Sequence, residues 1–570
     1  MSWARVFTLG ALLVLPGAHG MPRKSQVCKN IPGDPGWPSS SDWDSLNKTV
    51  DGRLISTRQL ATVCHGTEYD EEQCQSLKEA WPYAGVHVAE SAEFLMPFKQ
   101  NQSCDPFTSV ERPCELGNYA QYSIEVSSAG DIQAGIKFAK ENNIRLTIKN
   151  TGHDLLGKST GKGSLSLWTH GMNTIDFIDH YKGGSCYKGP AVKIGAGVLT
   201  ADIVKAASSK GYRVVTGTCP DVGVAGGYAS GGGHGVFTSV YGMAADNVLE
   251  WEVVTAEGEH LIATPTKNSD LYWALSGGGA GTFAAVISMT TRLHNDGAMA
   301  GASLAFDAEM AGSIENFWKA LATFQSALGP VVDAGAVASY AVIPYAVSVY
   351  GIAIPNGNAS SIEKILSPVA NAMAELGIEL NITTTMHSSY LDFYNSYFAE
   401  ATTATPAAQI TGGRLLPRAL VESSSGALDI AQAFEKALDG GFAIVCDAIN
   451  ANQRHPHSNS VFPSWRSSLL HCIFVKTWDW SMPWSDMTAF QRNLTEVVMP
   501  EIESVTPGGG AYLNEANFQQ PNWENEFYGD NYPRLKGIKS KVDPTGVFYS
   551  NTAVGSDLWK EDLSGRLCQV

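Results

Sequence analysis

The sequence predicts an α+β protein in which two mixed domains follow one another along the chain. Its 570 residues are too many for one hydrophobic core, since domains average roughly 150 residues. Apolar residues make up 44% and aromatic residues 10%, which is enough for large cores and excludes a disordered or collagen-like chain. Helix-like and strand-like patterns alternate from about residue 120 onward.

The chain begins with a stretch typical of a secretory signal peptide. Arg5 precedes an apolar run over 6–15, and Ala18-His19-Gly20 is a plausible cleavage site. The run is far shorter than the ~20 residues that cross a bilayer, so we expect residues 1–20 to be removed and no membrane span to remain. Five sequons agree with a secreted protein that carries N-glycans: Asn47, Asn101, Asn358, Asn381 and Asn493.

Residues 21–117 form a segment of their own. They are rich in Ser, Pro and Asp and show little periodicity. Half of the ten cysteines lie here, at positions 28, 64, 74, 104 and 114. We therefore expect an irregular N-terminal extension tied by disulfides, whose pairing the sequence does not define.

The first mixed domain is expected over residues 118–297. A helical face over 131–143 precedes an alternating strand over 144–149. Further strands are predicted over 191–194, 213–215, 248–255 and 284–292, with helices over 201–210 and 271–275.

The second mixed domain is expected over residues 298–505, with an antiparallel sheet. Helices are predicted over 313–328 and 362–376, and strands over 335–344, 346–354, 442–448 and 469–478. The remaining residues, 506–570, predict a strand over 511–515, a basic helix over 532–541 and a type I turn at Asp543-Pro-Thr-Gly.

Charge and glycine content narrow the class of ligand. The net charge is −17, which argues against nucleic acid or an anionic membrane as partner. Glycine is 57 of 570 residues, or 10% against about 7% on average. Much of it lies in 216–235, where exposed backbone N–H groups could hold an anion. A flexible linker is the alternative, but this stretch has Cys, Pro, Val and Tyr where linkers have Ser, Glu and Lys.

Two other glycine motifs match nucleotide-binding patterns in the wrong context. Gly152-x4-Gly157-Lys158-Ser159 matches a phosphate loop, but a loop and a strand follow it where that motif needs a helix. Gly279-x-Gly281-x-x-Ala284 matches a dinucleotide fingerprint, but a helix precedes it and a strand follows, which reverses the required order. Neither motif is expected to bind a nucleotide in that way.

Taken together, the motifs resemble the berberine bridge enzyme-like branch of the vanillyl-alcohol oxidase flavoprotein superfamily, most closely its secreted fungal members. The motifs that carry the resemblance are Lys149-Asn-Thr-Gly-His-Asp, Gly217-Thr-Cys-Pro, Gly226-Gly-Tyr-Ala-Ser-Gly-Gly-Gly, Tyr241-Gly-Met-Ala-Ala-Asp-Asn, Asn268-Ser-Asp-Leu-Tyr-Trp-Ala-Leu-Ser-Gly-Gly-Gly, Tyr512-Leu-Asn-Glu and Lys541-Val-Asp-Pro-Thr-Gly-Val-Phe. The resemblance implies a PCMH-type FAD-binding domain over 118–297 and a substrate domain over 298–505. Residues 506–570 then return to complete the FAD domain.

The same resemblance implies a bicovalent FAD. The family's histidine, bonded to the flavin 8α methyl, corresponds to His153, and its cysteine, bonded to C6, corresponds to Cys219. Taken singly, these residues would more often be a surface histidine and a disulfide cysteine. The further positions expected to bind the cofactor are Asn150, Thr151, Gly152, Gly217, Val222, Gly226, Gly227, Ser230, Gly231 and Gly232.

On the substrate side, the resemblance points to Tyr512, Asn514 and Glu515. Many relatives have a catalytic tyrosine where this chain has Glu515, whose carboxylate could accept a substrate proton as hydride leaves. An ion pair between Glu515 and a lysine or arginine is the alternative. Val222, three residues after the cysteine, accompanies oxygen reactivity in plant relatives.

We therefore expect a secreted FAD-linked oxidase of a small organic substrate (an alcohol, a sugar or a secondary metabolite) that passes electrons to molecular oxygen and releases H2O2. A dehydrogenase with another electron acceptor and a non-catalytic flavin-binding protein are the alternatives. Assigning Cys219 to the flavin leaves nine of ten cysteines, so at least one more should be unpaired. Cys446 and Cys472, on apolar strands, are the candidates.

Overall fold

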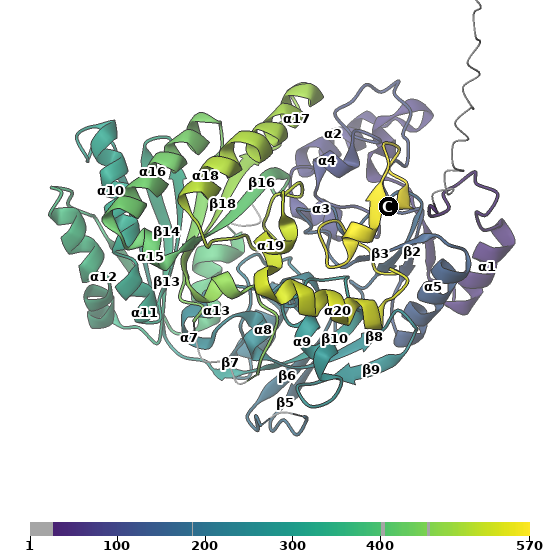
Figure 1. The fold of residues 1–570 in the computed structure, drawn as a ribbon, viewed down its shortest axis with the longest axis horizontal. Coiled ribbons are helices and arrows are strands. Elements are labelled where there is room, and N and C mark those ends of the chain that lie inside the picture. Colours follow the sequence, from purple (N-terminus) through teal and green to yellow (C-terminus); the bar gives the residue numbers. More distant parts are fainter. Residues whose placement is uncertain (1–26, 185, 401–404, 453–456) are drawn as a thin grey trace, which may run out of the picture.

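A computed structural model describes residues 27–570 apart from 185, 401–404 and 453–456 (Figure 1). The expected signal peptide, residues 1–20, lies outside the described residues. Within them, no helix is long and apolar enough to cross a membrane. Two sheets and the C-terminal segment build one half of the molecule, and a seven-stranded sheet with its helices builds the other.

The first half contains two sheets of different kinds. One has the order β1-β2-β4-β3, with β2, β4 and β3 parallel and β1 antiparallel to β2. The other is antiparallel in the order β5-β6-β10-β8-β9. Their bounds are β1 Leu54–Ser56, β2 Tyr122–Glu125, β3 Arg145–Lys149, β4 Ser164–Trp168, β5 Ile175–Ile178, β6 Ala191–Gly195, β8 Val248–Val254, β9 His260–Ala263 and β10 Ala285–Arg292.

Helix α5 (Ala129–Glu141) joins these two sheets, since it contacts β3, β4 and β8. Ser128 and Asp131 form a capping box that fixes its start, and Ile132 and Ile136 are fully buried on its inner face. The shorter elements of this half are α6 Thr200–Ser208, β7 Tyr212–Arg213, the π-helical turn η3 Val224–Tyr228, α7 Thr238–Tyr241, α8 Ala244–Asn247, α9 Ser269–Leu275 and β11 His294–Asn295.

The expected contexts of the two rejected nucleotide motifs are confirmed. Residues 152–159 contain no helix, and β4 follows them. Helix α9 precedes Gly279 and β10 follows it.

The second half is a seven-stranded antiparallel sheet in the order β15-β12-β14-β13-β17-β18-β16. Helices α10 (Ile314–Ser326), α12 (Ala359–Ala374) and α16 (Ser424–Asp439) pack against it and bury the largest core cluster (Figure 1). The strands are β12 Met299–Asp307, β13 Val337–Ile343, β14 Ala346–Pro355, β15 Thr383–His387, β16 Gln409–Pro417, β17 Ala443–Ala448 and β18 Ser468–Thr477. Shorter helices complete this half: α11 Gly329–Asp333, α13 Tyr390–Tyr394, α15 Arg418–Val421, α17 Trp484–Asn493 and α18 Met499–Val505.

The period of two along a strand separates the faces of this sheet. Tyr340 and Cys446, on β13 and β17, belong to the apolar core under the helices. Their neighbours Ser339, Asp447 and His471 are directly opposite one another on β13, β17 and β18. This cross-strand row therefore lies on the other face, away from the helices.

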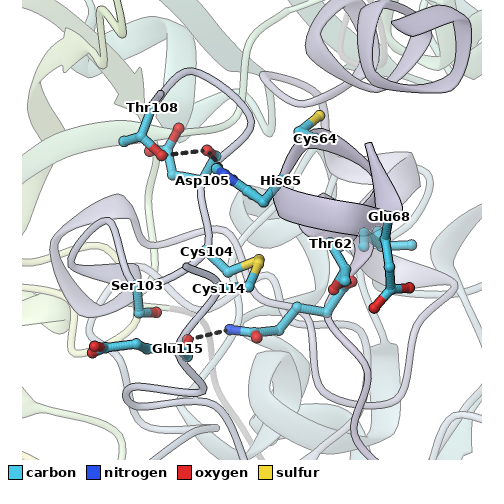
Figure 2. Close-up of a disulfide and its surroundings, with 12 residues drawn as sticks. Thr62, Cys64, His65, Glu68, Ser103, Cys104, Asp105, Thr108, Cys114 and Glu115 are labelled. Carbon is cyan, nitrogen blue, oxygen red and sulfur yellow. Dashed lines mark hydrogen bonds between the residues drawn. A yellow bond between two sulfur atoms is a disulfide. The ribbon is translucent and has the colours of Figure 1, made fainter. Parts of the chain in front are cut away.

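The N-terminal extension is more regular than expected. It contains α1 Ser40–Thr49, α2 Glu71–Ala80, α3 Ala84–Val88 and α4 Pro97–Gln100, and the N-caps Ser39 and Asp70 start the two longer helices. The short length of these helices explains why no clear period marks them. Disulfides Cys64–Cys74 and Cys104–Cys114 do tie this segment, with His65 beside them and its ring nitrogen 3.0 Å from the Asp105 carbonyl (Figure 2).

The C-terminal segment packs back onto the first half. Its helices are α19 Trp523–Tyr528 and α20 Tyr532–Val542, and α20 contacts α9. Phe548 forms a parallel bridge with Leu146 of β3, and β19 (Trp559–Glu561) pairs with β20 (Leu567–Gln569). Asp543 accepts hydrogen bonds from Lys539 and two backbone amides at the predicted turn. A disulfide joins Cys28 to Cys568, so the two ends of the described chain are linked.

Two predictions are wrong. The strand over 511–515 is absent: only Gly510 pairs, with Leu415, and the Glu515 amide donates to the Tyr512 carbonyl at 2.9 Å in a tight turn. Three consecutive glycines, 508–510, precede this turn and override the alternation that suggested a strand.

The candidates for the additional unpaired cysteine are also wrong. Cys446 and Cys472 lie opposite one another on β17 and β18 and form a disulfide. The expectation that one cysteine besides Cys219 is unpaired is nevertheless confirmed. That cysteine is the exposed Cys186.

Candidate active site

The loop after β3 carries the first predicted group. Gly152 has a φ of 83°, and a Cβ there would lie 2.9 Å from the Glu93 carbonyl, so the chain can turn here only through glycine. His153 follows, half-buried, and its Nε2 lies 2.8 Å from Asp221 Oδ1. Thr151 is buried and its hydroxyl accepts from the His153 amide at 3.4 Å.

The loop after β7 carries the second group. Cys219 is half-buried, and Asp221 stands two residues after it, so the contact to His153 brings both predicted attachment residues to one place. Burial raises the pKa of the Cys219 thiol to about 12, and the charges of Asp221 and Glu515 add to this. Val222 is half-buried, and its carbonyl accepts from the Thr200 amide at 3.0 Å.

Asp221 is held ionised by the histidine it contacts. Burial alone would raise the pKa of its carboxyl, but the hydrogen bond and charge of His153 lower it below the ordinary value. Because the bond uses Nε2, it leaves the other ring nitrogen of His153 available.

Glycines allow side chains to approach the backbone next to these loops. A Cβ on Gly223 would lie 2.1 Å from Asn150 Nδ2, and one on Gly231 would lie 2.4 Å from Asn514 Nδ2. By contrast, a Cβ on Gly227 would meet only Ala280, at 3.9 Å. The backbone at Gly227 therefore borders open space.

The remaining predicted positions surround that space. Gly217, Gly226 and Asn150 are half-exposed, whereas Ser230 and Gly232 are buried. The Ser230 carbonyl accepts from the amides of Gly277 and Gly279, at 3.0 and 2.9 Å, which joins two of the glycine-rich stretches.

Several polar atoms here lack a protein partner. Asn150 Oδ1, Thr216 Oγ1 and Ser230 Oγ are buried and have no hydrogen-bond partner among the described residues. Buried groups of this kind are normally satisfied, so they call for a polar ligand or water. Backbone amides, small glycines and orphaned hydroxyls suit the polar and phosphate groups of a dinucleotide without basic side chains. The residues present therefore fit FAD.

A cluster of ionisable side chains surrounds Glu515. Glu515 Oε2 accepts from His471 Nε2 at 2.7 Å and from His234 Nε2 at 3.3 Å. His234 Nδ1 lies 3.5 Å from Asp447 Oδ2, and the Ser339 hydroxyl donates to the other Asp447 oxygen. We call these five residues the histidine–carboxylate cluster.

The contacts within the cluster favour the charged forms of Glu515 and His234. Burial would raise the pKa of Glu515, but the charges and hydrogen bonds of His234 and His471 hold it well below its ordinary value. Burial would likewise lower the pKa of His234, yet the Glu515 charge raises it. Among the described residues, no lysine or arginine pairs with Glu515, so its partners differ from those of the expected alternative.

Tyr512 and Asn514 connect this cluster to the glycine backbone. Asn514 Nδ2 donates to the Tyr512 hydroxyl at 2.8 Å and to the Gly227 carbonyl at 2.9 Å. Burial and then the Glu515 charge raise the pKa of Tyr512, which stays a neutral phenol. The rings of Tyr512 and Trp465 lie 5.7 and 5.2 Å from the His471 ring and limit access of water to it.

The polar residues of these histidine–carboxylate contacts that were not predicted are Asp221, His234, Ser339, Asp447 and His471. Asp221 is the only charged residue of 216–235 besides a titratable His234, and that isolation was a usable signal. The sequence held no comparable signal for Asp447 and His471, because nothing in it fixes the strand register that places them together.

Comparison with known proteins agrees with this geometry. Residues 120–264 match the family described as FAD binding domain, and residues 511–555 match berberine and berberine like. A VAO-type flavoprotein oxidase, VAO615, of Thermothelomyces thermophilus is 45% identical over 96% of both chains. The chain belongs to the VAO-type flavoprotein family. It is accordingly an FAD-dependent oxidoreductase.

Further relatives cover the same length. The bifunctional decalin synthase calF of Penicillium decumbens is 45% identical over 99% of both chains. The crystal structure of the VAO-type flavoprotein MtVAO615 from Myceliophthora thermophila C1 is 44% identical, covers 95% of this chain and 100% of its own, and has a TM-score of 0.93. A xylooligosaccharide oxidase bound to xylobiose, from the same fungus, is only 20% identical with a TM-score of 0.61, and shares the fold alone. The α+β, PCMH-type fold is thereby confirmed.

Proposed function

We propose that this flavoprotein is an oxidase that removes a hydride from a small organic substrate, namely an alcohol, a sugar or a secondary metabolite, and returns the electrons to molecular oxygen as H2O2. The single observation that carries the proposal is the geometry around Glu515. A carboxylate held by two imidazoles directly follows Asn514, whose side chain donates to the Gly227 carbonyl at the open backbone, and its charge reaches the Cys219 thiol.

We further propose that His153 and Cys219 attach the FAD covalently. The two residues stand on adjacent loops, joined by the His153–Asp221 hydrogen bond, and Cys219 has no disulfide partner. The flavin, when bound, supplies the two-electron acceptance that no side chain offers. Asn150, Ser230 and the glycines 226 and 227 would hold its polar edge.

The chemistry of the protein itself centres on proton transfer. Glu515 remains ionised, so it can accept the substrate hydroxyl proton as the C–H hydride leaves. A carboxylate of such low pKa is a weak base, and the hydrogen bonds that it accepts from His471 at 2.7 Å and His234 at 3.3 Å hold it in place for this transfer. Tyr512 and Asn514 are positioned to orient the substrate oxygen.

The attachment can be tested by acid precipitation and mass spectrometry. The purified protein should stay yellow after denaturation, and its mass should exceed that of the polypeptide by one FAD. His153→Ala and Cys219→Ala should each keep one bond, and the double variant should release all flavin. Covalent flavin that survives in the double variant would refute the assignment.

Oxidase activity can be tested on the same preparation. An anaerobic stopped-flow screen of alcohols, oligosaccharides and phenolic metabolites should find a substrate that bleaches the flavin, and oxygen consumption with H2O2 release should follow when air is admitted. Bleaching without reoxidation by oxygen would favour a dehydrogenase. No bleaching across the panel, combined with bound flavin, would favour a non-catalytic protein.

We also propose that the protein is secreted and N-glycosylated. Four disulfides suit an oxidising compartment, and the sequon residues Asn101, Asn358 and Asn381 are exposed. N-terminal sequencing of protein from culture medium should begin after the first twenty residues, and glycosidase treatment should lower its mass. Intracellular protein of full-length mass would contradict this.

A further inference from the structure

The histidine–carboxylate cluster has the composition of a metal site. The ligand atoms of His234, His471 and Glu515 all lie within 4.8 Å of one another. Two imidazoles and one carboxylate are a ligand set of catalytic zinc sites, and these residues come from three separate parts of the chain. We propose that His234, His471 and Glu515 bind one divalent transition-metal ion of the Zn²⁺ class.

The three ligand atoms all lie within 4.8 Å of one another, so adjustment of the side chains would bring them to the spacing of such an ion. Ligands about 2.0–2.2 Å from a tetrahedral Zn²⁺ stand roughly 3.3 Å apart. His234 Nε2 and Glu515 Oε2 are already 3.3 Å apart, and His471 Nε2 and Glu515 Oε2 need to separate from 2.7 Å. Three protein ligands leave a fourth position open, as in zinc sites that bind small molecules.

The surroundings of the ligands supply a second, independent observation. A metal-bound histidine usually donates its other ring N–H to a carboxylate or carbonyl, which fixes the ring. His234 Nδ1 faces Asp447 Oδ2 at 3.5 Å, and Ser339 in turn holds Asp447. His471 Nδ1 is buried without a partner among the described residues, so this ring lacks the outer contact that Asp447 supplies to His234.

Metal binding changes the protonation of the cluster. A metal ion binds an unprotonated Nε2, so Zn²⁺ would displace the N–H that each Nε2 donates to Glu515. A neutral ring would then carry its proton on Nδ1, and a doubly protonated ring would release one proton to solvent. The metal site and the proposed function share Glu515, and a bound ion would remove this carboxylate from proton transfer. Metal binding and substrate oxidation are therefore alternative uses of the same cluster. The two can therefore be tested apart.

The test uses the flavin-loaded protein after treatment with a chelator and dialysis. Titration with ZnCl2, followed by calorimetry and elemental analysis, should show one ion per chain. Glu515→Gln and His471→Ala should each weaken binding at least about 100-fold, and Asp447→Asn about 10- to 100-fold. His260→Ala is the matched control, because His260 pairs with Glu252 at 2.8 Å on the surface and should leave the affinity unchanged.

Two results would overturn the site. The unmodified protein could bind Zn²⁺ no more tightly than the His471→Ala variant does, or His260→Ala could be the only variant that weakens Zn²⁺ binding. If the variants do not fold, anomalous diffraction from a Zn²⁺-soaked crystal of the unmodified protein decides, since a peak must lie between His234 and His471. Zn²⁺ that binds at the cluster while substrate still bleaches the flavin at full rate would support the metal site. The same result would refute Glu515 as the base.

Discussion

Two histidine–carboxylate contacts of nearly equal length belong to the candidate site. His153 lies 2.8 Å from Asp221, and His471 lies 2.7 Å from Glu515. The first is an isolated pair on two loops, with about a fifth of each side chain exposed. The second belongs to a cluster of five residues, and the His471 side chain is only 2% exposed.

The difference separates two uses of the same chemistry. An isolated pair orients one imidazole and leaves its other nitrogen free, which suits a residue that forms a bond once. The cluster holds Glu515 between two imidazoles and backs one of them with Asp447, so a proton can enter and leave repeatedly. Four substitutions test whether the two contacts differ in this way.

The largest effect is expected for Glu515→Gln. An amide cannot accept the substrate proton, so the rate of anaerobic flavin reduction should fall roughly 100-fold or more, while covalent flavin is unchanged. Stopped-flow absorbance with a substrate from the screen measures the rate. Glu252→Gln, a carboxylate that also pairs with a histidine, is the control. Near-normal reduction would remove Glu515 from the role of base.

Asp221→Asn should affect the other pair. Losing a charged acceptor costs about 1.5–3 kcal/mol, so flavin attachment through His153 should slow roughly tenfold or more. The comparison is made in a Cys219→Ala background, where only the histidine bond remains, by measuring acid-stable flavin against time. Asp202→Asn, exposed on α6, should have no effect. Equal attachment in both variants would mean that His153 needs no orienting partner.

A pH effect is expected for His471→Ala. The two histidines lower the pKa of Glu515, so the unmodified carboxylate stays ionised below its ordinary range and flavin reduction persists into acid. Removing one histidine raises that pKa, and the acid limb of the rate profile should move to higher pH. If the pH–rate profiles of the unmodified protein and His471→Ala coincide, His471 does not affect the proton-transfer step. His260→Ala is the control variant.

The smallest effect is expected for Ser339→Ala. It removes one hydrogen bond to Asp447, two steps from Glu515, which is worth about 1 kcal/mol or roughly fivefold in rate. The fall should appear in flavin reduction with unchanged substrate affinity. A loss as large as that of Glu515→Gln would place Ser339 in contact with the substrate.

The sequence predicted this site unevenly, and for a physical reason. His153, Cys219 and the glycines belong to contiguous motifs, in which a few neighbouring residues fix the loop. Alternation also predicted β13, β17 and β18, because each strand buries one face against helices. Periodicity shows which side chains of a strand share a face. It does not show which residue of the neighbouring strand lies opposite each of them. The row Ser339–Asp447–His471 depends on the register of β17 with β18 and on its register with β13, where Ser339 and Asp447 are 108 residues apart.

Local signals misled where glycine overrides alternation. Residues 511–515 alternate like a strand, yet the turn after Gly510 is what brings Glu515 back toward His471. Likewise, Cys446 and Cys472 seemed separate on their strands until the pairing of β17 with β18 set them opposite each other.

The link between Cys28 and Cys568 has a consequence for how the molecule is made. It closes a ring of chain with 540 residues between its ends. Phe548 bridges to β3, and Glu515 accepts hydrogen bonds from His234 and His471. Contacts in both halves of the molecule are therefore completed only when the last part of the chain has been made. A chain that ends before that segment lacks the Phe548 bridge and the proposed base, Glu515. We therefore expect truncated chains to be inactive, and we expect the proposed covalent attachment of FAD to follow synthesis of the whole chain.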